Sequence, residues 1–119
     1  MRKQIQNLGG MGRRSQKPSS AVLQQKTGIS GLDIILNGGL PNHTLTLLSG
    51  TSGTGKTILS FQWLFDGVKQ GENGIYISVT EPIFMAMRNI EAMEFYDRKA
   101  IEQKKLRVLD IPGRFRFRL

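Results

Sequence analysis

The sequence predicts an α/β protein in which helices cover a parallel sheet, and three observations support this fold class. Apolar segments of strand length alternate along the chain with segments whose apolar residues recur at helical spacing. The 119 residues, 39% of them apolar and 22% charged, suit one globular domain. A glycine-rich loop connects the first apolar strand to the first long helix: Gly50, Thr51, Ser52, Gly53, Thr54, Gly55, Lys56 and Thr57.

The first part of the chain, residues 1–23, is expected to be a basic, disordered leader. It is rich in Gly, Ser, Gln, Arg and Lys and holds few apolar residues that a core would bury. The folded part is expected to span residues 24–112. It opens with a turn and a short helix over residues 28–36, which Gly38 and Gly39 are expected to end because glycine adopts left-handed backbone easily.

The glycine-rich loop lies between a predicted strand and a predicted helix. Residues 44–49 begin with alternating Thr and Leu and end in an apolar run, which is typical of a strand covered on both faces. Residues 56–69 carry apolar side chains at helical spacing and are predicted to form a helix. Three aromatic side chains of this helix are expected to pack against the sheet: Phe61, Trp63 and Phe65.

Two more strands complete the predicted order. A polar, glycine-containing turn leads into a strand over residues 75–79. Pro82 suits the first turn of a helix that is expected to run to about residue 95. A shorter helix over about residues 97–104 then leads to a third strand, 106–110. Strands that alternate with helices in this way indicate parallel pairing.

The net charge of +8 raises the question of nucleic-acid binding, and its distribution argues against a basic binding face. Residues 1–20 hold five basic residues and no acid, and residues 104–119 hold six basic residues and one acid. Residues 21–103 hold six basic and eight acidic residues. The excess therefore lies at the two ends of the chain, where solvated tails explain it best.

Composition excludes several other classes of protein. The chain has no cysteine, so it forms neither a disulfide framework nor a thiolate metal site. His43 is the single histidine, is expected to be exposed beside a turn, and cannot build a zinc site without several carboxylates. No apolar run approaches the ~20 residues that cross a bilayer, and no apolar stretch follows the basic N-terminus. We therefore expect a cytoplasmic protein that does not bind membranes.

The loop 50–57 has the composition of a phosphate-binding loop. Gly50, Gly53 and Gly55 allow the backbone to aim several N–H groups at one anion, and the following helix adds its positive N-terminal end. Lys56 is expected to reach the β- and γ-phosphates of a nucleotide, and the Thr57 hydroxyl is expected to ligate Mg²⁺.

A longer pattern resembles the opening of a KaiC-type domain in the RecA-like ATPase superfamily. The matching segments are Gly28–Asp33, Gly38–Pro41, the loop 50–57, Ile75–Val79, Arg88–Asn89 and Lys105–Asp110. The resemblance implies a three-layer α/β/α core with a RecA-like parallel sheet, ATP with Mg²⁺ as ligands, and a ring, usually a hexamer, with nucleotide between subunits. No residue of the loop distinguishes ATP from GTP.

The chain departs from this family at the residues that activate the attacking group. The family commonly ends the second strand with two adjacent glutamates, which here align with Thr80 and Glu81. Glu81 is the remaining candidate for a catalytic carboxylate, because a threonine hydroxyl is a poor base at neutral pH. Lys56 is the other candidate catalytic residue. A solvated acid at a strand end is the alternative interpretation of Glu81.

The end of the chain departs from the family as well. The resemblance implies a later strand that carries the Walker B aspartate, and we expect the chain to be truncated before it. Asp110 ends an earlier strand and is interpreted as structural or peripheral. Residues 113–119 do not resemble the family, and their Arg and apolar residues alternate as in a two-faced strand.

Three functions follow from these observations. The preferred hypothesis is an ATP-binding, KaiC-like ATPase module in which phosphoryl-transfer chemistry is weak or inactive. The first alternative is a regulatory or scaffold module that binds nucleotide without hydrolysis, which Thr80 favours. The second is a DNA-interacting relative of the recombinases, in which the basic ends contact phosphates.

Overall fold

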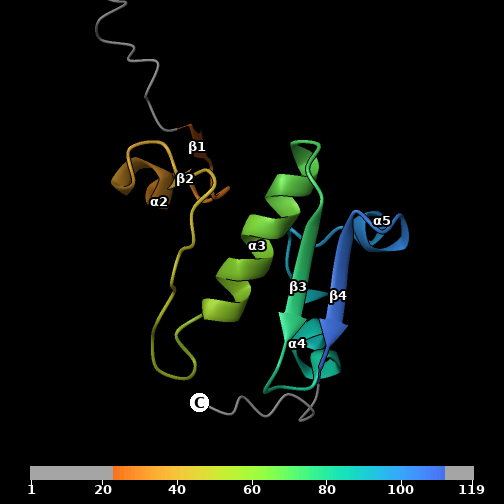
Figure 1. The fold of residues 1–119 in the computed structure, drawn as a ribbon. Coiled ribbons are helices and arrows are strands. Elements are labelled where there is room, and N and C mark those ends of the chain that lie inside the picture. Colours follow the sequence, from red (N-terminus) through yellow and green to blue (C-terminus); the bar gives the residue numbers. More distant parts are fainter. Residues whose placement is uncertain (1–22, 112–119) are drawn as a thin grey trace, which may run out of the picture.

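The computed structural model describes residues 23–111, and Figure 1 shows their arrangement. Helices and strands alternate in the C-terminal part, which confirms the predicted α/β class. The elements in chain order are β1 (Gln24–Gln25), α2 (Ser30–Ile35), β2 (Leu40–Pro41), α3 (Lys56–Lys69), β3 (Gly74–Ser78), α4 (Ile83–Ile90), α5 (Arg98–Glu102) and β4 (Leu106–Asp110). The long helix predicted after Pro82 is shorter than expected, because a turn follows Ile90.

Strands β3 and β4 form the parallel pair that the sequence predicts. Their register runs from Gly74 opposite Leu106 to Ser78 opposite Asp110. Helices α3, α4 and α5 all contribute buried side chains to one cluster against this pair. The described residues therefore form a sheet with helices on one face, while Ile75, Ile77 and Leu109 on the other face are 58%, 52% and 46% exposed.

The core lies between α3 and the covered face of the strand pair. Its fully buried members are Phe61, Phe65, Ala86, Ile90, Ala100 and Leu106. The Phe61 ring stacks on Tyr76 of β3, with 4.2 Å between ring centroids. Truncation of such a buried phenylalanine to alanine typically costs about 3–5 kcal/mol. The predicted packing of Phe61 and Phe65 against the sheet is confirmed.

Helix α3 forms because its apolar residues share one face and because local hydrogen bonds satisfy its C-terminal end. Gly55 precedes the helix in left-handed backbone, with φ of 89°. At the other end Gly71 is also left-handed, with φ of 89°. The N–H of Gly71 bonds to the Val68 carbonyl at 3.0 Å and that of Glu72 to the Gly67 carbonyl at 2.9 Å. This is the hydrogen-bond pattern of a Schellman ending, and it turns the chain directly into β3.

The short helix α2 ends one residue earlier than its glycines suggested. Asn37, with φ of 54°, is the left-handed residue, and the Gly38 N–H bonds back to the Asp33 carbonyl at 2.7 Å. The expectation that Gly38 and Gly39 themselves form the ending is therefore wrong in detail. Asparagine tolerates left-handed backbone better than most residues, so it can take the position that glycine usually fills.

A hydrogen-bonded pair fastens the start of the described chain to α2. Thr27 is 1% exposed, and both its N–H and its hydroxyl donate to Asp33 Oδ1, at 2.8 and 2.7 Å. Both hydrogen bonds lower the pKa of Asp33 below its usual value, and the bond from the Thr27 backbone has the larger effect. The charged carboxylate is therefore the form that the fold prefers.

The stability of the chain should depend on the charge of Asp33. A carboxylate whose pKa is lower in the folded state stabilises the fold above its unfolded-state pKa and loses this effect as pH falls through the folded value. We expect Asp33→Asn to lower the melting temperature near pH 7, and the difference from the parent to shrink below about pH 4. Circular dichroism melts across this range, with the exposed Glu94→Gln as control, measure the effect. A difference that is independent of pH would contradict this role of the charge.

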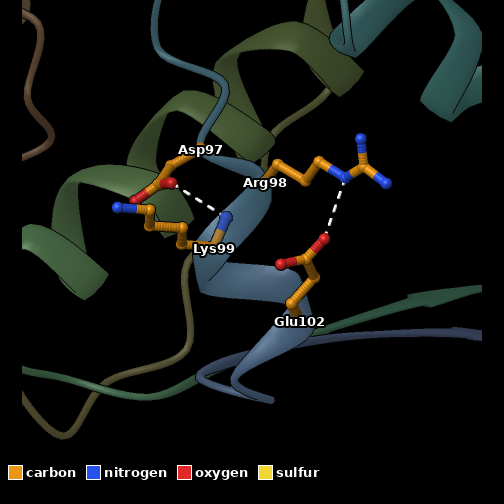
Figure 2. Close-up of polar contacts among 4 residues, drawn as sticks. All are labelled: Asp97, Arg98, Lys99 and Glu102. Carbon is orange, nitrogen blue, oxygen red and sulfur yellow. Dashed lines mark hydrogen bonds and ion pairs between the residues drawn. The ribbon is translucent and has the colours of Figure 1, made fainter.

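Helix α5 is stabilised by a side-chain cap and a surface ion pair, as Figure 2 shows. Asp97 precedes the helix and its carboxylate accepts a hydrogen bond from the Lys99 N–H at 3.0 Å. Arg98 Nε lies 2.9 Å from Glu102 Oε1, and both side chains are mostly exposed. The cap satisfies a backbone donor that the helix leaves free, whereas water screens the ion pair.

We expect the cap to contribute more to stability than the ion pair. Asp97→Ala should lower the free energy of unfolding by about 1 kcal/mol, because an N–H in the first turn loses its acceptor. Glu102→Ala, on the same helix, should lower it by only about 0.3–0.5 kcal/mol. Urea denaturation of both variants measures the two values. Equal losses would show that the cap has no special role.

The segment before the glycine-rich loop is not a strand in the structure, so the prediction for residues 44–49 is wrong for the described chain. No backbone hydrogen bond joins these residues to another described segment. Leu45 and Leu47 are 100% and 89% exposed. In Figure 1 the segment runs down the side of α3 that faces away from β3. A strand forms only beside a partner, and none of the described strands lies within reach.

Candidate functional site

The loop before α3 has the backbone conformation that an anion site requires. Gly53 and Gly55 have φ values of 80° and 89°, a region that side-chain-bearing residues rarely adopt. Nothing lies near the Cβ positions of these two glycines, so backbone conformation rather than space requires them. Thr54 braces the loop, because its hydroxyl donates to the Thr51 carbonyl at 2.8 Å.

Lys56 is folded back into the loop. Its Nζ donates to the carbonyls of Gly50 and Thr51, at 2.6 and 2.7 Å. Lys56 belongs to the first turn of α3, and the carbonyl groups of the loop hold its ammonium among the loop residues. This position places a positive charge where the sequence predicts the β- and γ-phosphates.

The N-terminal end of α3 offers free donors beside this charge. The first backbone bond into the helix runs from the Leu59 N–H to the Gly55 carbonyl, at 2.9 Å. The N–H groups ahead of Leu59 have no intrahelical partner, as at the start of any helix. Thr57, the predicted magnesium ligand, lies in this first turn. Free N–H groups, the helix dipole and an ammonium are the groups that favour an anion at a helix N-terminus.

The predicted catalytic residue Glu81 lies three residues after the end of β3. Figure 1 shows that the C-terminal ends of β3 and β4 lie at the same end of the molecule as the start of α3. Glu81 and Thr80 are exposed there, and the Ser78 hydroxyl donates to the Glu81 carbonyl. The topology therefore brings Glu81 to the same edge as the loop, without a contact between Glu81 and Lys56.

Asp110 has a local partner at the start of α4. Its Oδ2 lies 3.4 Å from the Ile83 N–H, close to the limit for a hydrogen bond. A carboxylate at this position favours the N-terminal end of a helix. Sequence reasoning did not identify this contact, because Ile83 and Asp110 are 27 residues apart. The geometry fits the structural role that the sequence predicted for Asp110.

The main cavity among the described residues is separate from the loop. It has a volume of about 560 Å³ and lies between α2, α3 and the segment 44–48. None of its lining residues belongs to the loop 50–57. Trp63 lines it, and the indole N–H of this half-buried side chain is buried without a partner. Trp63 thus faces away from the core that Phe61 and Phe65 form, which differs from the sequence expectation.

The groups of the loop 50–57 suit a nucleotide with its magnesium ion better than a metal ion alone. Among residues 23–111 no three His, Asp or Glu side chains gather in a way that could hold a metal ion. A site of backbone N–H groups, one lysine and one threonine hydroxyl instead suits phosphate oxygens, which themselves supply ligands to Mg²⁺. The described helices include none that is long and apolar enough to cross a membrane.

The parallel strand pair with helices, and the glycine-rich loop that opens into the long helix α3, are those of a RecA-like α/β fold. The family model for the KaiC ATPase matches residues 25–116, which is most of the chain. The chain therefore belongs to the KaiC family of ATPases.

Individual relatives agree with this assignment. A UPF0273 protein of Pyrococcus horikoshii is 48% identical over 79 residues, which are 66% of this chain and 32% of that protein. A UPF0273 protein of Methanopyrus kandleri is 39% identical over 90 residues, 76% of this chain and 36% of that protein. The circadian clock oscillator protein KaiC of Prochlorococcus marinus MIT 9313 is 44% identical over 95 residues, 77% of this chain and 19% of that protein. The chain thus spans about a third or less of each of these relatives.

Proposed function

We propose that the chain binds ATP with Mg²⁺ through residues 50–57. The observation that carries the proposal is the ammonium of Lys56, held in a loop with two left-handed glycines at the N-terminal end of α3. The remaining donors of the proposed site are the loop backbone N–H groups and the Thr57 hydroxyl. Membership of an ATPase family supports a nucleotide as the anion.

Each residue has a distinct proposed role in this site. Backbone N–H groups from Gly50 to Gly55 would surround the phosphates, and Lys56 would exchange its two carbonyl partners for phosphate oxygens. The Thr57 hydroxyl would contribute one ligand to Mg²⁺, whose charge neutralises the phosphates when it is bound. Glu81 would orient the attacking water or accept its proton.

Hydrolysis by this chain is proposed to be slow. Thr80 stands where the family resemblance implies a second carboxylate, and Asp110 faces the start of α4. A hydroxyl does not accept a proton at neutral pH as a carboxylate does. A role in which nucleotide is bound and only slowly turned over is therefore preferred. Assembly into a ring and a cytoplasmic location are further proposals that rest on the family.

Titration calorimetry with ATP, in the presence and absence of Mg²⁺, tests the binding proposal. Saturable binding that requires the triphosphate and strengthens with Mg²⁺ is the expected result. AMP is the matched control, because it presents the same base and sugar without the β- and γ-phosphates. Equal affinity for AMP and ATP would mean that residues 50–57 do not bind phosphates, and the proposal would fail.

A further inference from the structure

The carbonyl of Thr51 is held by two donors within the loop 50–57. The Thr54 hydroxyl donates to it at 2.8 Å, and the Lys56 ammonium donates to the same oxygen at 2.7 Å. A carbonyl oxygen has two lone pairs, so these two donors satisfy it completely. One donor is neutral and belongs to the loop, whereas the other is the charged group that is expected to contact phosphate.

Gly50 lies against the Thr54 hydroxyl, which explains why the loop has a glycine at this position. A Cβ atom at position 50 would lie 2.8 Å from Thr54 Oγ1, closer than Cβ atoms approach other atoms, and 3.7 Å from Lys56 Cδ, an ordinary contact. Unlike Gly53 and Gly55, Gly50 is not left-handed, so space rather than backbone conformation requires it. A methyl group at position 50 would therefore displace the Thr54 hydroxyl from its acceptor.

The Thr54 hydrogen bond gains importance when a nucleotide binds, because Lys56 then leaves the same carbonyl. In the proposed function the ammonium exchanges the Gly50 and Thr51 carbonyls for phosphate oxygens. The Thr51 carbonyl would then keep the Thr54 hydroxyl as its donor within the loop. Without this hydroxyl the loop would gain conformational freedom, and ordering its N–H groups around phosphate would cost more entropy.

We propose that Thr54 is a positioning residue that holds the loop in its phosphate-binding shape, and that Gly50 is required because it leaves room for the Thr54 hydroxyl. The inference rests on the proposed function, since it takes phosphate as the ligand of the loop. The Thr54 side chain acts through the Thr51 carbonyl and not through a contact of its own with the nucleotide. Loss of the hydroxyl should weaken ATP binding by roughly 3- to 10-fold, the range that one ordinary hydrogen bond supplies.

Titration calorimetry with ATP and Mg²⁺ tests the role of the hydroxyl. Thr54→Ala should show this loss of affinity, whereas Thr54→Ser should bind like the parent because it keeps the hydroxyl. Thr44→Ala is the matched control, because the Thr44 hydroxyl also donates to the carbonyl three residues earlier, that of Pro41, at 2.7 Å and outside the loop. The inference is wrong if Thr54→Ala binds ATP at least as tightly as Thr44→Ala, or if Thr54→Ser binds as weakly as Thr54→Ala.

A double-mutant cycle tests the requirement for Gly50. Gly50→Ala should weaken ATP binding in the parent about as much as Thr54→Ala does, because both changes remove the same hydrogen bond. In the Thr54→Ala background it should change the affinity by less than about twofold, because the oxygen is absent and position 54 retains only its Cβ, 3.6 Å away. Additive losses would overturn the link between the two residues.

The same measurements separate a failure of the inference from a failure of the proposed function. A parent chain that binds ATP no better than AMP would refute phosphate binding by the loop, and the inference with it. A parent that prefers ATP, together with a Thr54→Ala variant of equal affinity, would refute the inference alone. Circular dichroism establishes that each variant retains the parent secondary structure.

Discussion

Replacing Lys56 by alanine is expected to weaken ATP binding at least tenfold while the fold stays intact. The side chain holds its ammonium at 2.6 Å from the Gly50 carbonyl and 2.7 Å from the Thr51 carbonyl. A phosphate oxygen in place of these carbonyls would form a charge-assisted hydrogen bond, worth about 1.5–3 kcal/mol. Each ~1.4 kcal/mol corresponds to a factor of ten in affinity.

Lys69→Ala is the matched control for this prediction. Lys69 is an exposed lysine in the last turn of the same helix, at the end away from the loop. Its replacement removes the same unit of charge, so it reveals any general effect of net charge on ATP affinity. Titration calorimetry compares the two variants with the parent. If Lys56→Ala binds as tightly as Lys69→Ala, the ammonium does not contact phosphate and the phosphate-loop assignment is wrong.

The second large effect concerns turnover, which we expect to be very slow in the parent chain. Phosphoryl transfer depends on positioning the attacking group and on neutralising the charge that develops on the γ-phosphoryl oxygens. Loss of a positioned acid or base typically lowers the rate by about 10²–10⁴-fold. The resemblance to the KaiC family implies a carboxylate at the position of Thr80, and a threonine hydroxyl is a poor base at neutral pH. The proposed ground-state binding through Lys56 and Thr57 does not require that carboxylate.

Phosphate release with excess ATP and Mg²⁺ measures this turnover. Thr80→Glu should raise the rate, because it restores a carboxylate beside Glu81. Asn73→Glu is the control, since it adds the same charge at an exposed position at the opposite end of β3. Lys56→Ala should reduce any rate to background. A turnover of about one per second lies at the lower end of ordinary enzyme rates. If the parent reaches this rate and Lys56→Ala abolishes the turnover, Glu81 alone suffices and the prediction is wrong.

Features with a local physical cause were predicted well from the sequence. Helix α3 follows from the apolar spacing of residues such as Phe61 and Phe65, and both are fully buried. Strands β3 and β4 follow from short apolar runs, and their parallel pairing follows from the helices between them. The residue type permits the left-handed backbone at Gly53 and Gly55, which the sequence identified as positions of conformational freedom. Apart from the strand pairing, the residues that carry each signal lie within a few positions of one another.

Features that depend on distant partners were not predictable in the same way. Residues 44–49 have a strand sequence, yet Leu45 is fully exposed because no described strand pairs with them. The side chain of Trp63 lies on the helix α3 that also carries Phe61, yet it lines a separate cavity. Asp110 meets Ile83 only because β4 ends beside the start of α4.

The sequence by itself determined the phosphate-loop motif, the α/β order and the membership of the KaiC family, because each depends on residue types at fixed spacing. Tertiary structure alone decided which apolar faces are covered and which acids meet a partner. The end of β3, which Glu81 follows, lies at the same edge as the loop because α3, which the loop opens, runs in the opposite direction to β3. Spacing along the chain specifies local conformation, whereas pairing and burial depend on groups that only the fold brings together.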